Sequence, residues 1–378
     1  MYKNYINIFI LFFFIQFIYS QNISYLIRNK RSIAIKKNPL YSNPIRYYIS
    51  NEIKNKDIIK KSLTYLQHYT CLKFNEIENK IDINGINFMQ SNQNSIDFTY
   101  YDKNISFVNL TIQCIEDLGC LKHFLAGALG LQPDSSRADR NKFIKIMEEN
   151  LDNLYTKYYN AENGYSTKIF NTGFDYGSIM LQNTTYGSKN GQPVFNSKLS
   201  PYYDYMIGQR NDYSHNDLKL INSFYCPNFC ITKIEPCFNG GYPHPYCQAC
   251  VCPEGFEGRH CNIIARSQGP CGETSLKASK DKKILNIKGQ GKCIFSISSK
   301  KGTTIDITVD YVKTNNKIRC SQYMGLEIKH RYDKGAMGLC LCGEYRNITI
   351  PKTKQNVVII YNGKESDHEF KISYKMIK

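Results

Sequence analysis

The spacing of hydrophobic and polar residues along this chain predicts both helices and strands. Between Asn55 and Tyr69, apolar residues recur every three or four positions, which is typical of a helix with one buried face. The residues that carry this spacing are Ile58, Ile59, Leu63 and Leu66. Three runs rich in Ile, Val and Thr predict strands, at Ile45–Ile49, Ile305–Val309 and Val357–Tyr361. The last two are typical of a β-sandwich.

The longest apolar run lies at the N-terminal end, from Ile8 to Ile18, and only Gln16 interrupts it. Lys3 precedes the run and the small residue Ser20 follows it. This pattern predicts a signal peptide over residues 1–20. The run is short for a membrane span, and no second stretch like it follows. We therefore expect a secreted, extracellular protein with no membrane span.

A basic cluster, Arg28-Asn29-Lys30-Arg31, follows the signal peptide. We expect cleavage after Arg31, which removes a pro-segment of residues 21–31 and leaves Ser32 at the new N-terminus. The alternative is an exposed basic turn that is not cleaved.

The net charge and the length of the chain limit its expected partners and its number of domains. The 378 residues carry a net charge of +17 at pH 7. Such a charge favours anionic partners such as acidic glycans. An overall composition rich in Lys, Asn, Ile and Tyr explains it equally well. No basic run is dense enough to indicate nucleic-acid binding, so the expected partners are extracellular proteins or anionic glycans. The length allows two or three domains.

Fifteen cysteines in a secreted chain predict a disulfide framework, and the odd count leaves one thiol over. Three of them lie between Cys71 and Cys120, and twelve lie from Cys226 onward. Asn-x-Ser/Thr sequons predict glycosylation. Outside the pro-segment they stand at Asn104, Asn109, Asn183 and Asn347.

The stretch from His123 to Asn141 carries the candidate chemistry. It resembles the zinc-site signature of the astacin family of secreted endopeptidases, H-E-x-x-H-x-x-G-x-x-H-E-x-x-R-x-D-R-D. The residues that match without a gap are His123, Gly130, Arg137, Asp139 and Arg140. The resemblance implies a zinc enzyme with a metzincin-like, α+β peptidase domain, here over residues 32–229. It also implies that Gly119–Leu131 is the helix that bears the site.

The same register shows that the catalytic chemistry is missing. Phe124 stands at the position of the family's general-base Glu, so no catalytic residue is intact there. Gly127 and Pro133 stand at the second and third zinc ligands. A catalytic zinc site needs three protein ligands and an open position, and only His123 survives. We therefore expect zinc, the family's cofactor, to bind weakly or not at all.

Further matches support the family but not its activity. Met180 keeps the position of the Met-turn, whereas Gln182 replaces the family Tyr that follows it. Cys226 follows a stretch that matches the family's end pattern, and the resemblance implies that it pairs with Cys71. Arg137, Asp139 and Arg140 are expected to hold the loop after the helix by charge-assisted hydrogen bonds. Asp134 stands where the family has a Glu, and it could pair with the amine of Ser32.

His123 has other interpretations. It fits a helix histidine that is hydrogen-bonded in an apolar site, and we favour this over metal binding. Because Cys120 lies three residues earlier on the same helical face, the two could instead form a thiolate–imidazole pair. The candidates for the unpaired thiol are Cys114, Cys120 and Cys340.

Two smaller modules follow. Residues 230–264, with Cys252-Pro253-Glu254-Gly255 and five further cysteines, resemble an EGF-like module, in which Cys252–Cys261 is the safest pairing. Residues 271–378 resemble a CUB domain, with Cys271, Cys293, Cys320 and Cys342 expected in disulfides. The residues after Cys320 are Ser321, Gln322 and Tyr323, where calcium-binding CUB domains have an acid, so calcium is doubtful. We expect this domain to bind protein or glycan, or to pack on the first domain.

Two functions remain open. The favoured one is a secreted astacin-family homologue without activity, a pseudoprotease that acts as a binding or regulatory protein. The alternative is an active zinc metalloendopeptidase with a non-standard metal site that cleaves extracellular proteins. If only the ligands have been lost, then replacing Gly127 and Pro133 by His should rebuild zinc binding.

Overall fold

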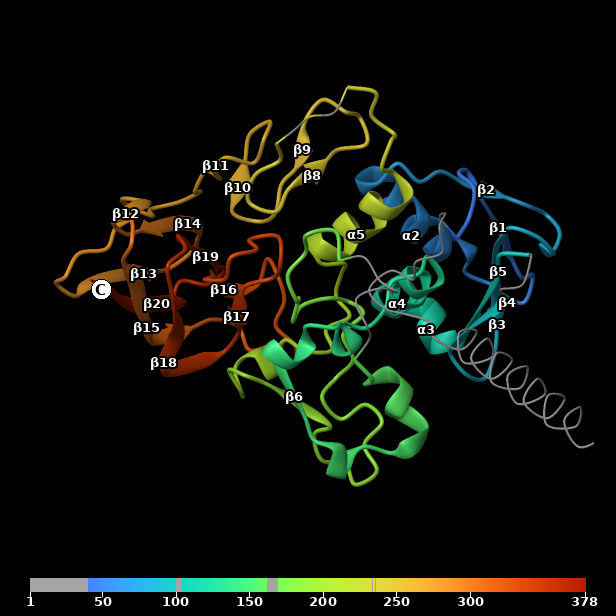
Figure 1. Cartoon of the computed structure of the whole chain (residues 1–378), viewed down its shortest axis with the longest axis horizontal. Coiled ribbons are helices and arrows are strands. Elements are labelled where there is room, and N and C mark those ends of the chain that lie inside the picture. Colours follow the sequence, from blue (N-terminus) through green and yellow to red (C-terminus); the bar gives the residue numbers. More distant parts are fainter. Residues whose placement is uncertain (1–39, 100–102, 162–168, 233, 235) are drawn as a thin grey trace, which may run out of the picture.

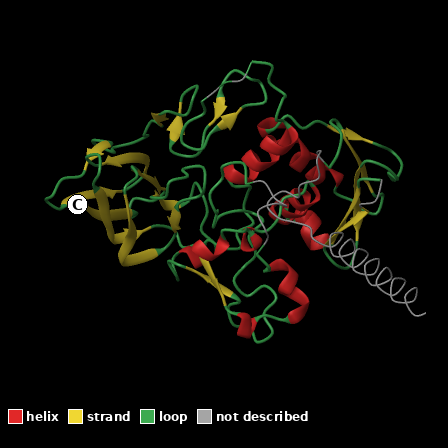
Figure 2. Cartoon of the chain, viewed as in Figure 1, coloured by secondary structure: helices red, strands yellow, loops and turns green. Residues whose placement is uncertain are grey.

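The N-terminal and C-terminal strands lie at opposite ends of the molecule, and most of the helices lie between them (Figures 1 and 2). The structure, a computed structural model, describes residues 40–99, 103–161, 169–232, 234 and 236–378. The predicted signal peptide, the pro-segment and the Arg31–Ser32 cleavage site lie outside these residues. Within the described ranges, no helix combines the length and the apolar character that a membrane crossing requires.

The N-terminal part is a five-stranded sheet with helices packed on it. The sheet order is β2-β1-β3-β5-β4, and only β4 runs antiparallel to its neighbour. The strands are β1 (Ile45–Ile49), β2 (Phe74–Glu76), β3 (Gly85–Gln90), β4 (Ser95–Thr99) and β5 (Ile105–Leu110). The helices are α2 (Lys56–Tyr69), α3 (Ile112–Glu116), α4 (Leu118–Ala128) and α5 (His215–Tyr225). The helix and strand predicted before residue 70 are confirmed.

The burial pattern of α2 shows why this segment is a helix. Ile59, Leu63 and Leu66 are buried on one face, and they join a core formed by the sheet, α4 and α5. At the start of α5, Ser214 and Asp217 form a capping box, in which each side chain accepts from the backbone N–H of the other.

Between α4 and α5 the chain has little regular structure. Two short strands, β6 (Ile144–Ile146) and β7 (Phe195–Ser197), pair antiparallel. The remaining elements are 3-10 helices, at Asp134–Ser136, Arg140–Lys142, Glu148–Asn150, Asn153–Tyr158 and Tyr203–Tyr205.

The next part is small and depends on disulfides for its stability. Its bonds are Cys230–Cys247, Cys237–Cys250 and Cys252–Cys261. Its strands are two residues long and form two hairpin-like pairs: β8 (Tyr242–Pro243) with β9 (Cys250–Val251), and β10 (Phe256–Glu257) with β11 (Ile263–Ile264). This is the EGF-like module.

The C-terminal part is a sandwich of two sheets, ordered β12-β14-β19-β16-β17 and β13-β20-β15-β18. The first sheet contains β12 (Ser275–Lys277), β14 (Gly291–Ser298), β16 (Gly325–Lys329), β17 (Leu339–Leu341) and β19 (Val357–Gly363). The second contains β13 (Lys283–Lys288), β15 (Thr304–Lys313), β18 (Glu344–Thr353) and β20 (Glu369–Ile377). Along β15 buried and partly buried residues alternate, as expected of a strand with one face in the core. The α+β fold class, with an EGF-like module and a CUB-type sandwich, is confirmed.

Seven disulfides account for fourteen of the fifteen cysteines. Besides the three of the EGF-like module, they are Cys71–Cys226, Cys114–Cys120, Cys271–Cys293 and Cys320–Cys342. Of the three candidates for the unpaired thiol, Cys340 is the free one, and it is buried. Cys114 and Cys120 are bonded to each other, which also rules out a thiolate–imidazole pair between Cys120 and His123.

The sandwich is packed tightly against the part of the chain that precedes it. The segment 330–338, between β16 and β17, reaches into the part formed by residues 143–207; we call it the 330–338 loop. One hydrophobic core contains buried residues of both parts, among them Phe174, Met206, Met337 and Leu339. Packing of the CUB domain on the first domain was one of the alternatives left open by the sequence, but the sequence did not identify the residues of this shared core.

Polar contacts of the 330–338 loop fix this arrangement. Arg331 donates to the carbonyl oxygen of Phe174 over 2.6 Å, and its guanidinium lies 5.1 Å from the ring centre of Tyr176. The Asp333 carboxylate accepts from the backbone N–H of Gly173 and from the Asn216 amide. Although burial opposes it, these hydrogen bonds hold the pKa of Asp333 below its ordinary value.

We expect Arg331→Ala to destabilise the whole chain by about 2–3 kcal/mol, because it removes a charged hydrogen-bond donor from two carbonyl groups at this contact. Urea unfolding measures the change. Arg346→Ala is the matched control: Arg346 lies on the same sandwich, 64% exposed, and pairs with an exposed Glu344, so its loss should cost under about 1 kcal/mol. Equal effects of the two substitutions would contradict the assignment.

Candidate active site

Helix α4 carries three of the positions in question, His123, Phe124 and Gly127. Its N-terminus is capped by Asp117, whose carboxylate accepts from the N–H groups of Gly119 and Cys120. The helix ends at Ala128, and Gly130 follows the cap with a positive φ of 98°, so that the N–H of Leu131 bonds back to the carbonyl of Ala126. The helix is therefore well formed, and the glycine turn of the signature is present.

His123 is held as a structural histidine. Its Nδ1 lies 2.9 Å from the carbonyl oxygen of Ile179, so the ring N–H is donated to the backbone of the Met-turn segment. Burial, together with the nearby Arg210 guanidinium, lowers the pKa of His123 to about 3. The imidazole is neutral at any physiological pH. Its Nε2 remains the one ring atom that could face a ligand.

The space at Gly127 is occupied by a neighbouring strand. A Cβ placed on Gly127 would lie 2.5 Å from Cδ1 of Ile96, on β4, and 3.7 Å from Cε of Met180. A terminal methyl group can move for a Cβ, but an imidazole needs the volume of the whole Ile96 side chain. The expectation that His at 127 and 133 would rebuild the site stays a prediction, to which the structure adds one condition: Ile96 has to make room.

The other family positions offer no replacement chemistry. The ring of Phe124 packs edge-on against His123, with ring centres 5.1 Å apart, and belongs to the hydrophobic core. Gln182, at the family Tyr position, accepts from the Arg210 guanidinium over 3.0 Å. Pro133 is buried and precedes a 3-10 helix. It has no donor atom in its side chain.

The Met-turn segment is fixed from α5. The Asp217 carboxylate accepts from the Ser178 hydroxyl over 2.6 Å and from the Ile179 N–H over 2.9 Å. Met180 is 5% exposed and packs in the same core as α4. On the other side of the segment, Gly177 leaves room for Met337 of the 330–338 loop, whose Sδ would lie 2.2 Å from any Cβ there.

The charged residues after α4 hold the backbone. Arg137 is 1% exposed, makes a bidentate contact with Asp139, and donates to the carbonyl oxygens of Thr172 and Gly173. Arg140 donates to the carbonyl oxygen of Ser135. These contacts fit the structural role expected for both arginines.

Asp134 also contacts the backbone. It accepts from the N–H of Asp175, and burial raises its pKa to about 7. Its suggested partner, the amine of Ser32, lies outside the described residues.

The residues of this site do not fit a zinc ion. One imidazole nitrogen is available, the adjacent space holds Ile96 and Phe124, and a guanidinium cation stands nearby. In the described part of the chain, no three His, Cys, Asp or Glu side chains lie close enough together to hold a metal ion.

Sequence reasoning missed two residues of this site. Ile96 lies in a stretch that resembles nothing in the signature, and only the sheet order brings β4 beside α4. Arg210 lies in the stretch before Cys226 that matches the family's end pattern, but that match does not place its side chain at Gln182 and near His123.

Comparisons with known proteins agree with the resemblance found in the sequence. The sequence model of the Astacin peptidase family matches residues 33–226. Among curated proteins, zinc metalloproteinase nas-34 of Caenorhabditis elegans is 26% identical over 357 residues, which is 93% of this chain and 58% of that protein. Zinc metalloproteinase dpy-31 of Teladorsagia circumcincta is 32% identical over 236 residues, 61% of this chain and 38% of that protein.

Among solved structures, high choriolytic enzyme 1, a hatching enzyme zinc-protease of Oryzias latipes, aligns with a TM-score of 0.44 and 24% identity. The match covers 51% of this chain and 98% of that one. The chain spans about 60% or less of the length of the curated relatives it matches, for example 61% of nas-36 of Brugia malayi.

We expect the double variant Gly127→His, Pro133→His to bind no zinc and to lose stability, because the new imidazole competes with Ile96 for space. Adding Ile96→Ala should clear that space and raise zinc affinity above that of the double variant. Isothermal titration with zinc measures both, with Ile96→Ala alone as the control. A double variant that keeps its circular dichroism spectrum and binds one zinc would show that Ile96 is no obstacle.

Proposed function

This chain belongs to the astacin family of peptidases, and we propose that it is a pseudoprotease: an extracellular binding or regulatory protein that keeps the peptidase fold without hydrolysing peptides. The observation that carries the proposal is the environment of His123. Its ring N–H is donated to Ile179, Phe124 packs against it, and Ile96 lies against Gly127 one turn further along the helix.

Peptide hydrolysis in a zinc peptidase needs three functions, and this site supplies none of them. A metal must polarise the carbonyl and lower the pKa of a bound water. A carboxylate must take the proton of that water. A donor must stabilise the negative charge of the transition state. Phe124 cannot accept a proton, and Gln182 is already bonded to Arg210.

Other properties of the chain support a stable scaffold. The buried arginines after α4, the Asp217 contacts with the Met-turn segment and the Cys71–Cys226 bond hold the peptidase fold in place. We propose the division into a peptidase-like domain at 32–229, an EGF-like module at 230–264 and a CUB domain at 271–378.

We also propose that the signal peptide at 1–20 directs secretion. Cleavage after Arg31 then exposes Ser32 as the new N-terminus, without producing an active enzyme. The seven disulfides support an oxidising compartment.

The purified mature protein is expected to contain no stoichiometric zinc and to leave casein and gelatin uncleaved. Elemental analysis and a gel-based cleavage assay test this, with an active astacin-family enzyme as the positive control. Equimolar zinc together with chelator-sensitive cleavage would favour the alternative, an active peptidase with a non-standard metal site.

Three of the four sequons should carry glycans. Asn104, Asn183 and Asn347 are exposed, whereas Asn109 is partly buried and its amide donates to Ser95 and Asp97. In the Asn183 sequon the Thr185 hydroxyl donates to the side-chain amide oxygen of Asn183. Mass spectrometry of the secreted protein before and after N-glycanase treatment should show occupancy at these three positions and not at Asn109.

A further inference from the structure

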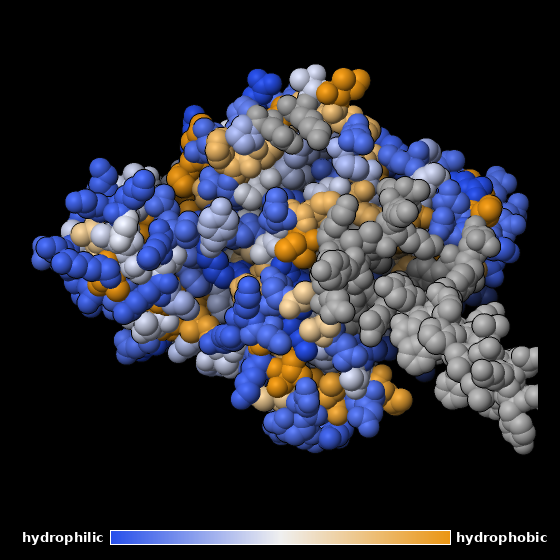
Figure 3. Space-filling view, viewed as in Figure 1, coloured by the Kyte–Doolittle hydropathy of each residue, from blue (hydrophilic) through white to orange (hydrophobic). Residues whose placement is uncertain are grey.

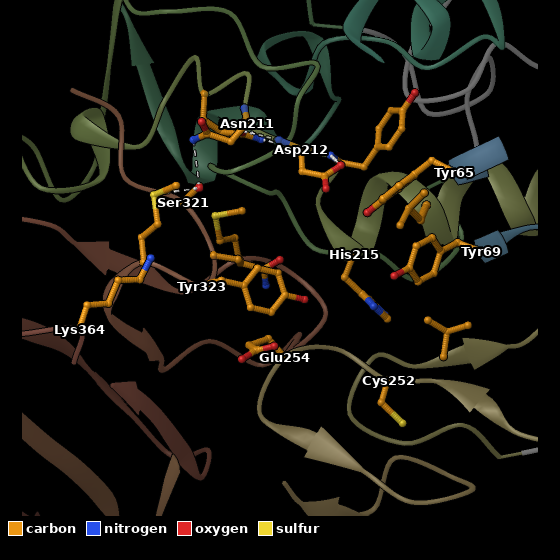
Figure 4. A pocket seen from close by; sticks show the side chains of 17 residues that line it. Tyr65, Tyr69, Asn211, Asp212, His215, Cys252, Glu254, Ser321, Tyr323 and Lys364 are labelled. Carbon is orange, nitrogen blue, oxygen red and sulfur yellow. Dashed lines mark hydrogen bonds between the residues drawn. The ribbon is translucent and has the colours of Figure 1, made fainter. Parts of the chain in front are cut away.

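A cavity of about 330 Å³ lies where the three parts of the chain meet, away from the degenerate metal site. We call it the junction cavity. Helix α2 contributes Tyr65 and Tyr69, the EGF-like module contributes Glu254, and the sandwich contributes Gln322 and Tyr323. Figure 4 shows the α2 tyrosines on one side and Tyr323 reaching in from the other, above Glu254. Its volume is within the range of small-molecule sites.

Aromatic rings form much of the wall. Tyr65 lies 5.0 Å from Tyr69 and 5.9 Å from Tyr213, measured between ring centres, and Tyr323 closes the opposite side. Such rings offer flat apolar faces with polar hydroxyl edges. This surface suits a ligand that has both an apolar face and hydroxyl groups, as a sugar ring does.

Both carboxylates of the junction cavity already have a lysine partner. Asp212 is paired with Lys122 over 2.6 Å, and Glu254 is paired with Lys292 over 2.7 Å. The Lys122 ammonium already stands 3.8 Å from the ring centre of Tyr65, so the cation–π position is occupied.

Lys364, which also lines the junction cavity, has no ion-pair partner among the described residues. The net free charge is therefore positive.

One buried donor in the wall has no acceptor. Gln322 is 9% exposed, and its Nε2 has no hydrogen-bond partner within the described ranges. Buried polar groups are nearly always satisfied, so an isolated amide in a cavity wall indicates a ligand atom that accepts from it. The nearby Asn211 amide is already bonded to the Ser321 hydroxyl.

We propose that the junction cavity binds an acidic saccharide unit, a sugar ring that carries a carboxylate or a sulfate. The ring stacks on the tyrosines, and its acidic oxygens accept from Gln322 and Lys364. The proposal deepens the binding role proposed above, on which it rests for its extracellular setting. It names the ligand class and places it at the contact of all three parts.

Isothermal titration of the full mature chain tests the proposal with four probes: a sulfated heparin tetrasaccharide, an unsulfated hyaluronan tetrasaccharide, neutral maltotetraose and inorganic sulfate. Binding is expected for one or both acidic tetrasaccharides, and their comparison tells sulfate from carboxylate. Maltotetraose and sulfate alone should bind at least about ten-fold more weakly.

Gln322→Leu and Lys364→Ala should each weaken binding by about ten-fold. Gln322→Leu removes an amide without a partner, so the fold should persist, and circular dichroism checks this. If that variant fails to fold, the binding measured for Lys364→Ala tests the proposal instead. Lys364 is exposed, so its replacement should not disturb the fold.

Lys301→Ala, which removes an equally exposed charge from a distant turn of the sandwich, is the matched control and should leave binding unchanged.

Three results would overturn the proposal: no binding of any acidic probe at millimolar concentration, equal binding of maltotetraose, or equal weakening by Lys301→Ala. Equal weakening by Lys301→Ala would show that the acidic probes are attracted only by the net positive charge of the protein. Zinc content and casein cleavage are measured separately. A junction cavity that binds no saccharide therefore leaves the pseudoprotease proposal standing, and an active zinc enzyme would leave the saccharide proposal standing.

Discussion

The burial of the 330–338 loop against residues 173–177 is the contact on which the arrangement of the whole chain depends. Arg331, Asp333 and Met337 bond to backbone or carboxylate groups of the peptidase-like part. The same loop packs Met337 against Gly177, two residues before the backbone carbonyl that holds His123. The sandwich therefore helps to support the segment that holds His123. On the face shown in Figure 3, hydrophilic residues predominate and apolar residues form small separate groups.

Local pattern was enough to predict individual helices and strands, and the resemblance to the astacin family, with the EGF-like and CUB modules, implied the fold class. The apolar spacing of α2 and the β-branched runs of β1, β15 and β19 depend on residues close in sequence, so they can be read directly. The replacements at Phe124, Gly127 and Pro133 follow directly from aligning the chain with the family signature. What filled the emptied space could not be predicted, because Ile96 reaches Gly127 only through the order of strands in the sheet. The shared core and the junction cavity depend on contacts between segments far apart in the chain, for which the sequence has no local signal.

Packing and hydrogen bonds occupy the surroundings of His123. An empty polar pocket costs stability, and apolar side chains that fill it restore packing. Ile96 lies against Gly127, Phe124 packs against His123, and Arg210 donates to Gln182. A ligand introduced at Gly127 therefore has to displace a packed side chain. The contacts of Arg137 and Arg140 with the backbone stabilise the fold whether or not a metal binds.

The shared core also has a consequence for biosynthesis. Asp175 and Met337 are hydrogen-bonded although 162 residues separate them in the chain. At the usual pace of translation, the segment around Phe174 and Met206 waits about 10–30 s before the strands that cover it leave the ribosome. During that interval its apolar side chains are exposed, and a chain cut short before the sandwich never covers them. Stable folding of the peptidase-like part is thus tied to completion of the sandwich.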